Sequence, residues 1–225
     1  MPVGRPAPAA RASVSPLVAM LVALVLIQAG VLALALLVAR TPVANAVFDF
    51  DVAGARAVHS LQHTTLTRVA ADFTALGTET TAVMYGLFAA LVIGALAGTR
   101  RGVWLAVVVL GGYGVWTLTR ELAQRPRPEL FRLAEAQGYS FPSGHALMSV
   151  CLFVGAAIAV APVAKGAGAR AGLTLVALLV PLAMGFARLY QGVHNPSDVL
   201  AGWAIGLVWV LVSARVSGQT RGPHR

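Results

Sequence analysis

Cysteine and acidic residues are scarce in this chain of 225 residues. Its one cysteine, Cys151, allows no disulfide bond within a chain, which excludes a fold stapled by disulfides. Aspartate and glutamate together number 8, against 17 lysines and arginines, and charged residues make up only 11% of the chain. A typical soluble domain has roughly 25% charged residues. This shortage of charge excludes an ordinary soluble domain.

Long polar stretches are also missing. The chain is 58% hydrophobic, its mean hydropathy is +0.78, and apolar runs of about 18 or more residues recur along it. Such runs can cross a membrane, and each should be a helix because backbone groups cannot stay unpaired in lipid. We predict an all-α polytopic membrane protein, with six transmembrane helices forming one bundle over residues 17–214. The runs are Leu17–Ala39, Thr80–Gly98, Gly102–Thr119, Ala146–Val163, Ala171–Leu189 and Ser197–Ala214.

The first apolar run has an alternative interpretation as a secretory signal, because Ala44-Asn45-Ala46 resembles a peptidase site. Its apolar core of about 23 residues is longer than the usual 7–15 of a signal, and Arg40 precedes the site. We therefore favour an uncleaved membrane helix.

The basic residues divide unevenly between the two ends of the predicted helices. The connections after the second and fourth helices, the tail at 1–16 and the tail at 215–225 carry nine cations and no acidic residue. The positive-inside rule then places both termini in the cytoplasm of a multi-pass cell-membrane protein. The tail at 1–16 is rich in Pro, Ala and Arg and is predicted to be disordered. The scattered charge argues against a nucleic-acid partner.

Segment 40–79 is the longest connection and is predicted to lie outside the cell. Its second half has apolar residues at helical spacing on one face, which predicts an amphipathic helix at the membrane surface. They are Leu66, Val69, Ala70, Phe73 and Leu76. Two glycine pairs elsewhere, Gly94-x3-Gly98 and Gly202-x3-Gly206, permit close helix contacts in membranes. The number of associating chains is left open, a homo-oligomer included.

Three polar clusters stand at the ends of apolar runs. With both termini inside, all three reach the outer membrane interface, where we expect one site. They are Arg120-x6-Arg127-Pro128, Pro142-Ser143-Gly144-His145 and Arg188-x5-His194-x3-Asp198.

The first two clusters suit a phosphate group. A guanidinium fork binds phosphate oxygens through two parallel hydrogen bonds, although a single arginine at a helix end is often only an anchor in the headgroup layer. Ser143 and Gly144 open a helix, where free backbone N–H groups form an anion site. The alternative for Ser143 is a plain N-cap, which leaves His145 unexplained.

The third cluster suits a nucleophile. His194 and Asp198 have i, i+4 spacing, so they lie on one side of a helix start. A carboxylate there can accept the Nδ1 proton and leave Nε2 free to attack. The alternative is that Asp198 only caps the helix.

Two other polar pairs are predicted to carry no chemistry. His59 and His63 have i, i+4 spacing that could suit a metal, but no third ligand cluster accompanies them. Asp49 and Asp51 are interpreted as loop charges. We predict no metal site and no cofactor.

Together the three clusters resemble the type 2 phosphatidic acid phosphatase superfamily, whose pattern is K-x6-R-P, P-S-G-H and S-R-x5-H-x3-D. All three spacings match over residues 120–198. The stretch Thr74-Ala75-Leu76-Gly77 also resembles the family, although more weakly than the three clusters. Arg120 stands where the pattern usually has Lys, and Ala187 where it usually has Ser.

The resemblance implies a metal-independent lipid phosphatase. Arg120, Arg127 and Arg188 would hold the phosphoryl oxygens with backbone groups of Ser143 and Gly144. His194 would attack phosphorus to form a phosphohistidine, supported by Asp198. His145 would protonate the leaving oxygen and then help to activate water.

Placement at the outer interface suggests a lipid phosphate whose tail stays in the bilayer. The candidates are polyprenyl (undecaprenyl-type) diphosphate, which we favour, phosphatidic acid and phosphatidylglycerol phosphate. An alternative is a non-hydrolytic lipid-phosphate binding or transport protein, although binding alone would not require two histidines and an aspartate. Soluble haloperoxidases share the superfamily, but six spans argue against that activity.

Overall fold

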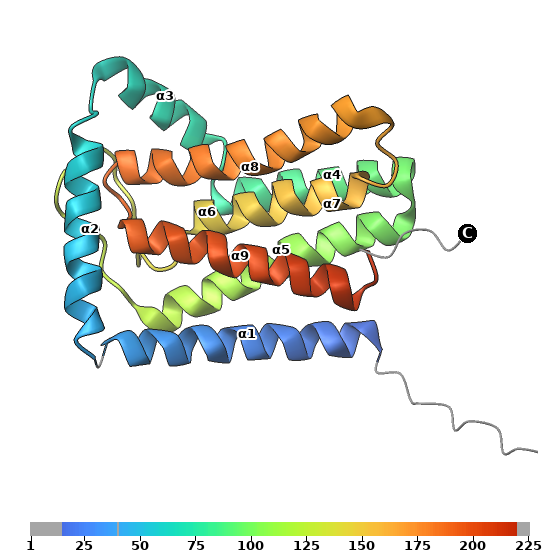
Figure 1. The fold of residues 1–225 in the computed structure, drawn as a ribbon, viewed down its shortest axis with the longest axis horizontal. Coiled ribbons are helices and arrows are strands. Elements are labelled where there is room, and N and C mark those ends of the chain that lie inside the picture. The colour runs from blue at the N-terminus through green and yellow to red at the C-terminus, as the bar shows by residue number, and fades with distance from the viewer. Residues whose placement is uncertain (1–14, 40, 220–225) are drawn as a thin grey trace, which may run out of the picture.

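The computed structural model describes residues 15–39 and 41–219, and every regular element in that part of the chain is helical (Figure 1). The all-α prediction is therefore confirmed for the described residues. The elements are α1 (Pro16–Ala39), α2 (Val43–His59), α3 (Thr64–Ala75), α4 (Glu79–Ala97), α5 (Thr99–Ala123), α6 (Gly144–Ser149), the π-helical turn η1 (Val150–Val154), α7 (Gly155–Val160), α8 (Gly166–Tyr190) and α9 (Pro196–Val216).

The long helices α1, α4, α5, α8 and α9 run along a common direction, together with the continuous rod formed by α6, η1 and α7 (Figure 1). Helix α2 lies across one end of this bundle, and α3 leans against the same end. The α5–α6 loop and the α8–α9 loop also reach this end. Most of the predicted site residues therefore lie toward this end of the bundle.

Four helices, α4, α5, α8 and α9, are long and apolar enough to cross a membrane. Two other apolar stretches, Val18–Ala33 and Gly144–Val160, are shorter. Every helix of the bundle coincides with one of the predicted apolar runs to within five residues at each end. The six-span count itself stays a prediction.

The core of the bundle is apolar, and so is much of its outer surface. Fully buried side chains such as Leu105, Leu147 and Val210 join α5, α6 and α9 at the centre. On α4, by contrast, Leu91 and Leu96 are 74% and 80% exposed. Exposed apolar patches of this kind mark contact surfaces. With the four long apolar helices, this outer surface fits contact with lipid chains.

Small residues allow α9 to approach α6 closely. A Cβ atom at Gly202 would lie 2.6 Å from the Ser143 carbonyl oxygen, and one at Gly206 would lie 2.9 Å from the Leu147 carbonyl oxygen. Such backbone approach is possible only without a side chain. The second glycine pair thus packs helices within one chain, and it brings the start of α6 beside the start of α9.

Residues 41–78 contain two helices where one was predicted. Helix α3 matches the predicted amphipathic helix, but part of its apolar face contacts protein: Ala70 packs against Ala187 and Tyr190 of α8, with Leu66 and Phe73 beside it. Val69 and Leu76 remain exposed. Helix α2 was not predicted, and the suspected peptidase site at 44–46 lies within its first turn.

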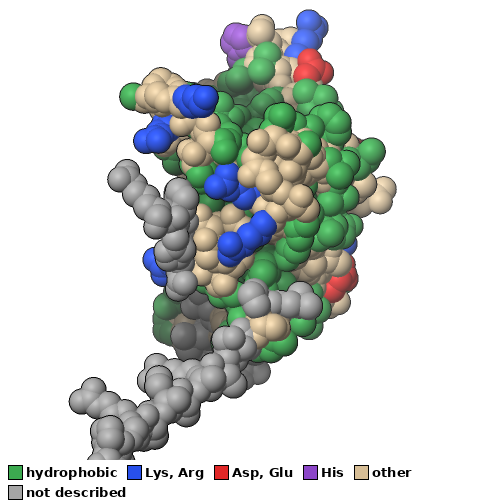
Figure 2. Space-filling view, turned by 90° about the vertical axis from the view of Figure 1, so that its right-hand side faces the viewer, with side chains coloured by type: hydrophobic (Ala, Val, Ile, Leu, Met, Phe, Trp, Pro, Cys, Tyr) green, Lys and Arg blue, Asp and Glu red, His purple; other side chains and the backbone are tan. Residues whose placement is uncertain are grey.

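The opposite end of the bundle carries basic residues. The α4–α5 and α7–α8 connections contribute Arg100, Arg101, Lys165 and Arg170, and α9 contributes Arg215 in its last turn. Figure 2 views this end and shows Lys and Arg side chains across it, with acidic side chains only at the margins. The predicted tails lie largely outside the described residues.

Candidate active site

The α8–α9 loop carries His194. Helix α8 ends at Tyr190, and Gly192 turns the chain with φ +65°, a conformation that favours glycine. A side chain there would also collide with the Phe131 carbonyl. Asn195 then precedes α9 and Pro196 is its first residue, a common way to start a helix. This tight turn fixes His194 immediately before α9, with only 4% of the residue exposed.

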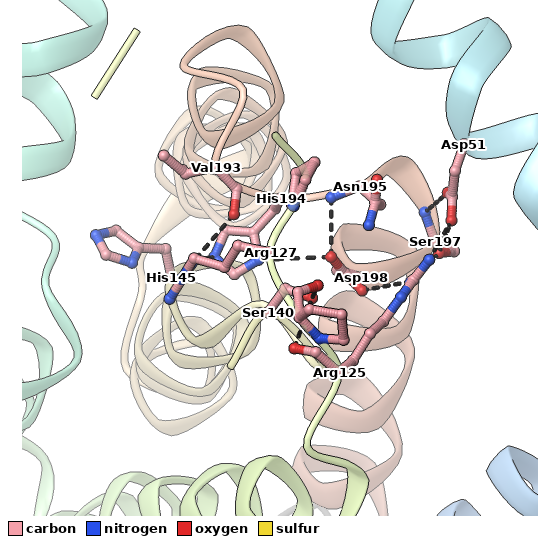
Figure 3. Close-up of polar contacts among 12 residues, drawn as sticks. Asp51, Arg125, Arg127, Ser140, His145, Val193, His194, Asn195, Ser197 and Asp198 are labelled. Carbon is pink, nitrogen blue, oxygen red and sulfur yellow. Dashed lines mark hydrogen bonds and ion pairs between the residues drawn. The ribbon is translucent and has the colours of Figure 1, made fainter. Parts of the chain in front are cut away.

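The two ring nitrogens of His194 face different partners (Figure 3). Nε2 lies 3.2 Å from Arg127 Nη1, and Nδ1 lies 3.8 Å from Asp198 Oδ2, which is ion-pair range but longer than a hydrogen bond. Because a guanidinium can only donate, Nε2 must accept, and the proton of the neutral ring is on Nδ1. This is the tautomer that a nucleophilic histidine requires.

Burial keeps the His194 ring neutral. It lowers the pKa of His194 from 6.5 to about 4, and the charges of Arg127 and Arg188 act in the same direction. The Asp198 carboxylate opposes the shift without cancelling it. The Nε2 lone pair is therefore available at neutral pH.

Asp198 is fully buried and has two strong partners besides His194. Arg125 Nη1 donates to its Oδ1 at 2.7 Å, and the Asn195 backbone N–H donates to its Oδ2 at 2.8 Å. Asp198 thus caps α9 as predicted and also faces His194, while its orienting role for the ring stays a prediction. Arg125 was not predicted as a site residue, although the presence of four arginines within residues 120–132 pointed to this loop as part of the site.

Asp51 of α2 joins the same cluster, which corrects its interpretation as a loop charge. Its carboxylate accepts hydrogen bonds from Arg125, from the Ser197 backbone N–H and from the Ser197 hydroxyl, at 2.7–2.8 Å (Figure 3). It is only 3% exposed. Its neighbour Asp49 is exposed, as expected for a surface charge.

His145 is buried and its contacts lie on the side of α3 and α4. Nδ1 lies 3.1 Å from Glu79 Oε1, and Nε2 lies 3.3 Å from the Thr74 carbonyl oxygen. In Figure 3 the ring points away from His194. The two histidines share one end of the bundle, but their rings do not face each other in this structure. Glu79 was missed from the sequence because it lies 66 residues from His145.

Arg188 lies between the residues around His194 and the residues around His145. It is buried in the last turn of α8, close enough to Glu79 and Arg127 for their charges to interact. Its Nη1 donates to Gln191 Oε1 at 2.7 Å, and Gln191 in turn donates to the Thr74 hydroxyl at 2.9 Å. Arg188 Nε is buried and has no hydrogen-bond partner among the described residues.

Ser143 departs from its predicted role, whereas the role of the Gly144 backbone N–H stays a prediction. The Ser143 backbone N–H donates to the Asp198 carbonyl at 3.0 Å, so it joins α6 to α9 and does not face a free anion site. The Ser143 hydroxyl makes no cap bond and is buried without a partner within the described part of the chain. Gly144 is required for packing, because a Cβ atom there would collide with Glu79 and Trp116.

Arg127 is held mainly by backbone oxygens. Its Nη1 donates to the Val193 carbonyl at 2.8 Å, and its Nη2 donates to the Gln137 carbonyl at 3.0 Å. Burial lowers the pKa of Arg127, as do the nearby charges of Arg132 and Arg120, whereas Glu79 and Asp198 oppose this.

Arg120 is the least engaged of the predicted site residues. It pairs with its exposed neighbour Glu121 at 2.9 Å and lies over the Trp116 ring, 4.6 Å from the centroid. It makes no hydrogen bond to either histidine among the described residues, so its phosphate role stays a prediction.

A small pocket lies beside His194. Ala55 and His59 of α2 line it together with Phe131, Leu189 and Gly192. The His59 and Phe131 rings stack with centroids 4.0 Å apart. His63 instead caps α3 through Nδ1. His59 and His63 therefore have separate packing and capping roles.

Comparison with known proteins identifies the family of this chain. Residues 101–221 match the model of the PAP2 superfamily, and this range contains all three polar clusters. The chain is 28% identical over 169 residues to phosphatidylglycerophosphatase B of Bacillus subtilis, covering 73% of this chain and 81% of that protein. It is 33% identical over 142 residues to decaprenylphosphoryl-5-phosphoribose phosphatase of Mycobacterium tuberculosis, covering 59% and 73%.

Two solved structures share the fold. A transmembrane PAP2-type phosphatidylglycerolphosphate phosphatase from Bacillus subtilis matches with a TM-score of 0.70 at 21% identity, over 93% of this chain and 98% of that one. LpxE of Aquifex aeolicus matches with a TM-score of 0.56 at 24% identity, over 73% and 94%. The family match, the curated relatives and the apolar helices lead to one conclusion: the chain belongs to the PAP2 superfamily and is a membrane lipid phosphatase, a hydrolase of phosphoric esters.

Proposed function

We propose that the protein hydrolyses a lipid phosphate or diphosphate through a phosphohistidine on His194. The contact that carries this proposal is the one between Arg127 Nη1 and His194 Nε2 at 3.2 Å, because a phosphoryl oxygen bound by Arg127 would be brought to the attacking nitrogen. Asp198 on the other side of the ring would stabilise the imidazolium that forms.

The phosphoryl group would lie among Arg127, Arg188 and the Ser143 hydroxyl. Arg188 Nε and the Ser143 hydroxyl are buried donors without partners among the described residues, which suits an incoming anion. Their charges and dipoles would stabilise the oxygens during in-line transfer, the main requirement of phosphoryl chemistry. Arg120 would join them by leaving Glu121. The backbone N–H of Ser143 has no part in this proposal.

In the first step the Nε2–P bond forms and the P–O bond to the lipid breaks, while His145 gives its proton to the leaving oxygen. His145 would exchange its contact with the Thr74 carbonyl for that oxygen, with Glu79 holding Nδ1 throughout. In the second step water attacks phosphorus, His145 takes a proton from it, and inorganic phosphate leaves His194. This chemistry needs no metal, since arginines supply the positive charge.

The favoured substrate is a lipid presented at the outer face of the cell membrane. The basic end of the bundle would face the cytoplasm with both termini, and α2 and the site would face outward (Figure 2). The relatives are named for a phosphatidylglycerol phosphate and for a decaprenyl-linked phosphate. A polyprenyl diphosphate, phosphatidic acid and phosphatidylglycerol phosphate are accordingly the first candidates.

The test is phosphate release from this lipid panel by purified protein in detergent with a chelator present. We expect the wild type to release phosphate and His194→Ala to lose at least about 10³-fold in rate, as for other nucleophile deletions. The matched control is His63→Asn, which keeps a capping side chain on α3 and should stay fully active. Full activity of His194→Ala would overturn the mechanism.

The alternative, a non-hydrolytic lipid-phosphate binder, makes a different prediction. It requires lipid binding with no phosphate release by the wild type on any substrate in the panel. An acid-labile phosphoryl group on the wild type that is missing from His194→Ala would decide against it.

A further inference from the structure

We propose that Asp51 on α2 is a positioning residue for Asp198 and acts through Arg125. The inference rests on the proposed function, in which Asp198 supports His194. Arg125 bridges the two carboxylates: Nη1 donates to Asp198 Oδ1 and Nη2 donates to Asp51 Oδ2, both at 2.7 Å (Figure 3).

The bridge lies in a buried setting. The Asp198 and Asp51 side chains are 0% and 3% exposed, and that of Arg125 is 30% exposed. Although burial by itself would lower the pKa of Arg125, the two carboxylates raise it. A buried carboxylate that loses its partner is strongly destabilised. The three charges therefore depend on one another.

Ser197 ties Asp51 directly to the start of α9. Its backbone N–H donates to Asp51 Oδ1 at 2.8 Å, and its hydroxyl donates to Asp51 Oδ2 at 2.7 Å. The same hydroxyl accepts from Arg125 Nη1 at 2.7 Å. Asp51 thereby holds the residue that precedes Asp198 and satisfies one of the free N–H groups at the helix start.

Steric fit holds α2 in this place as well. Gly54, one turn after Asp51, faces the first residue of α9, and a Cβ atom on Gly54 would lie 2.5 Å from Pro196 Cγ. A larger residue at position 54 would leave no room for α2 to lie this close to the start of α9. Helix α2 is thus fitted to the start of α9 by hydrogen bonds at Asp51 and by close packing at Gly54.

The consequence for catalysis concerns the direction of the Asp198 carboxylate. Arg125 holds Oδ1, and the Asn195 N–H holds Oδ2 on the side of His194 Nδ1. Without Asp51, Arg125 Nη2 loses its acceptor and the guanidinium is free to turn away from Oδ1. The carboxylate then rotates and His194 loses its orientation. Because Asp51 does not touch the phosphoryl group, its loss should lower kcat and leave KM unchanged.

The experiment is Asp51→Asn in the full-length protein in detergent, with phosphate release measured over a range of lipid phosphate concentrations. We expect kcat to fall about 10- to 100-fold with KM within twofold of the wild type. The matched control is Asp49→Asn, which changes an exposed carboxylate on the same helix and should retain wild-type kcat. Ser197→Ala keeps the backbone hydrogen bond to Asp51 and should give a smaller loss of kcat. This variant replaces Asp51→Asn as the test if Asp51→Asn does not fold.

A double mutant separates positioning from a general loss of structure. In an Arg125→Gln background, Asp51→Asn should cause little further loss of kcat, because both changes break one linkage. Wild-type kcat in Asp51→Asn, or losses that multiply in the double mutant, would overturn the inference. An inactive wild type would overturn the proposed function instead, so the two failures are distinguishable.

Discussion

His145 Nδ1 lies 3.1 Å from the Glu79 carboxylate, and this contact joins the start of α6 to the start of α4. Each histidine of the site therefore faces a carboxylate: Asp198 for His194 and Glu79 for His145. The first pair is local, whereas the second is brought together only by the bundle. Both carboxylates stand in the first turn of a helix, where negative charge is favourable.

Replacement of Glu79 by Gln should impair the step that depends on His145. An amide cannot stabilise the imidazolium that protonates the leaving oxygen, and general acid–base catalysis is worth about 10²- to 10⁴-fold. We expect kcat for phosphate release to fall about 10- to 100-fold. Glu121→Gln, which changes an exposed carboxylate on α5, is the control and should stay within threefold of the wild type. Equal activity of Glu79→Gln and Glu121→Gln would show that Glu79 takes no part in catalysis.

The depressed pKa of His194 makes stability depend on pH. The unfolded chain binds a proton at His194 below pH 6.5, but the folded protein does so only near pH 4. Stability is therefore complete above pH 6.5 and is lost as the pH falls toward 4, by about 3 kcal/mol at most. Thermal unfolding in detergent should show the wild type losing stability relative to His194→Gln over this range. If the difference in stability between the wild type and His194→Gln stayed constant from pH 7 to pH 4, the ring would not be buried.

Gly144→Ala should damage both folding and activity. The added methyl group would collide with the Glu79 carboxylate and the Trp116 ring, and overpacking of this kind costs about 1–3 kcal/mol. We expect a lower thermal midpoint and at least tenfold slower phosphate release. Gly114→Ala on α5 has no atom within 4 Å of the new Cβ and should leave both unchanged. Identical behaviour of the two variants would exclude close packing at Gly144.

Charge placement predicts which end of the bundle faces outward. A cysteine at exposed Glu129, in a Cys151→Ala background, should react with a membrane-impermeant maleimide on intact cells. A cysteine at exposed Arg170, on the opposite end, should react only after the cells are made permeable. Labelling in the reverse order would place the site in the cytoplasm and make the substrate a lipid of the inner leaflet.

Several site contacts could not be predicted because they join distant parts of the chain. Arg125 and Asp51 are 74 residues apart, and Ser197 and Asp51 are 146 apart. No periodicity or motif spacing relates such positions. The role of the Ser143 N–H was also unpredictable, since its acceptor is the Asp198 carbonyl on another helix.

Hydropathy, helical period and capping act over a few residues, so the helical class, the limits of the long helices and the turn between His194 and Asp198 could be predicted from the amino-acid sequence. The position of α2, the contact of His145 with Glu79 and the direction of the His145 ring could be seen only in the folded bundle. These features depend on packing between helices, where glycines such as Gly54 and Gly202 set the distance of approach and buried charges take the partners that the bundle brings within reach.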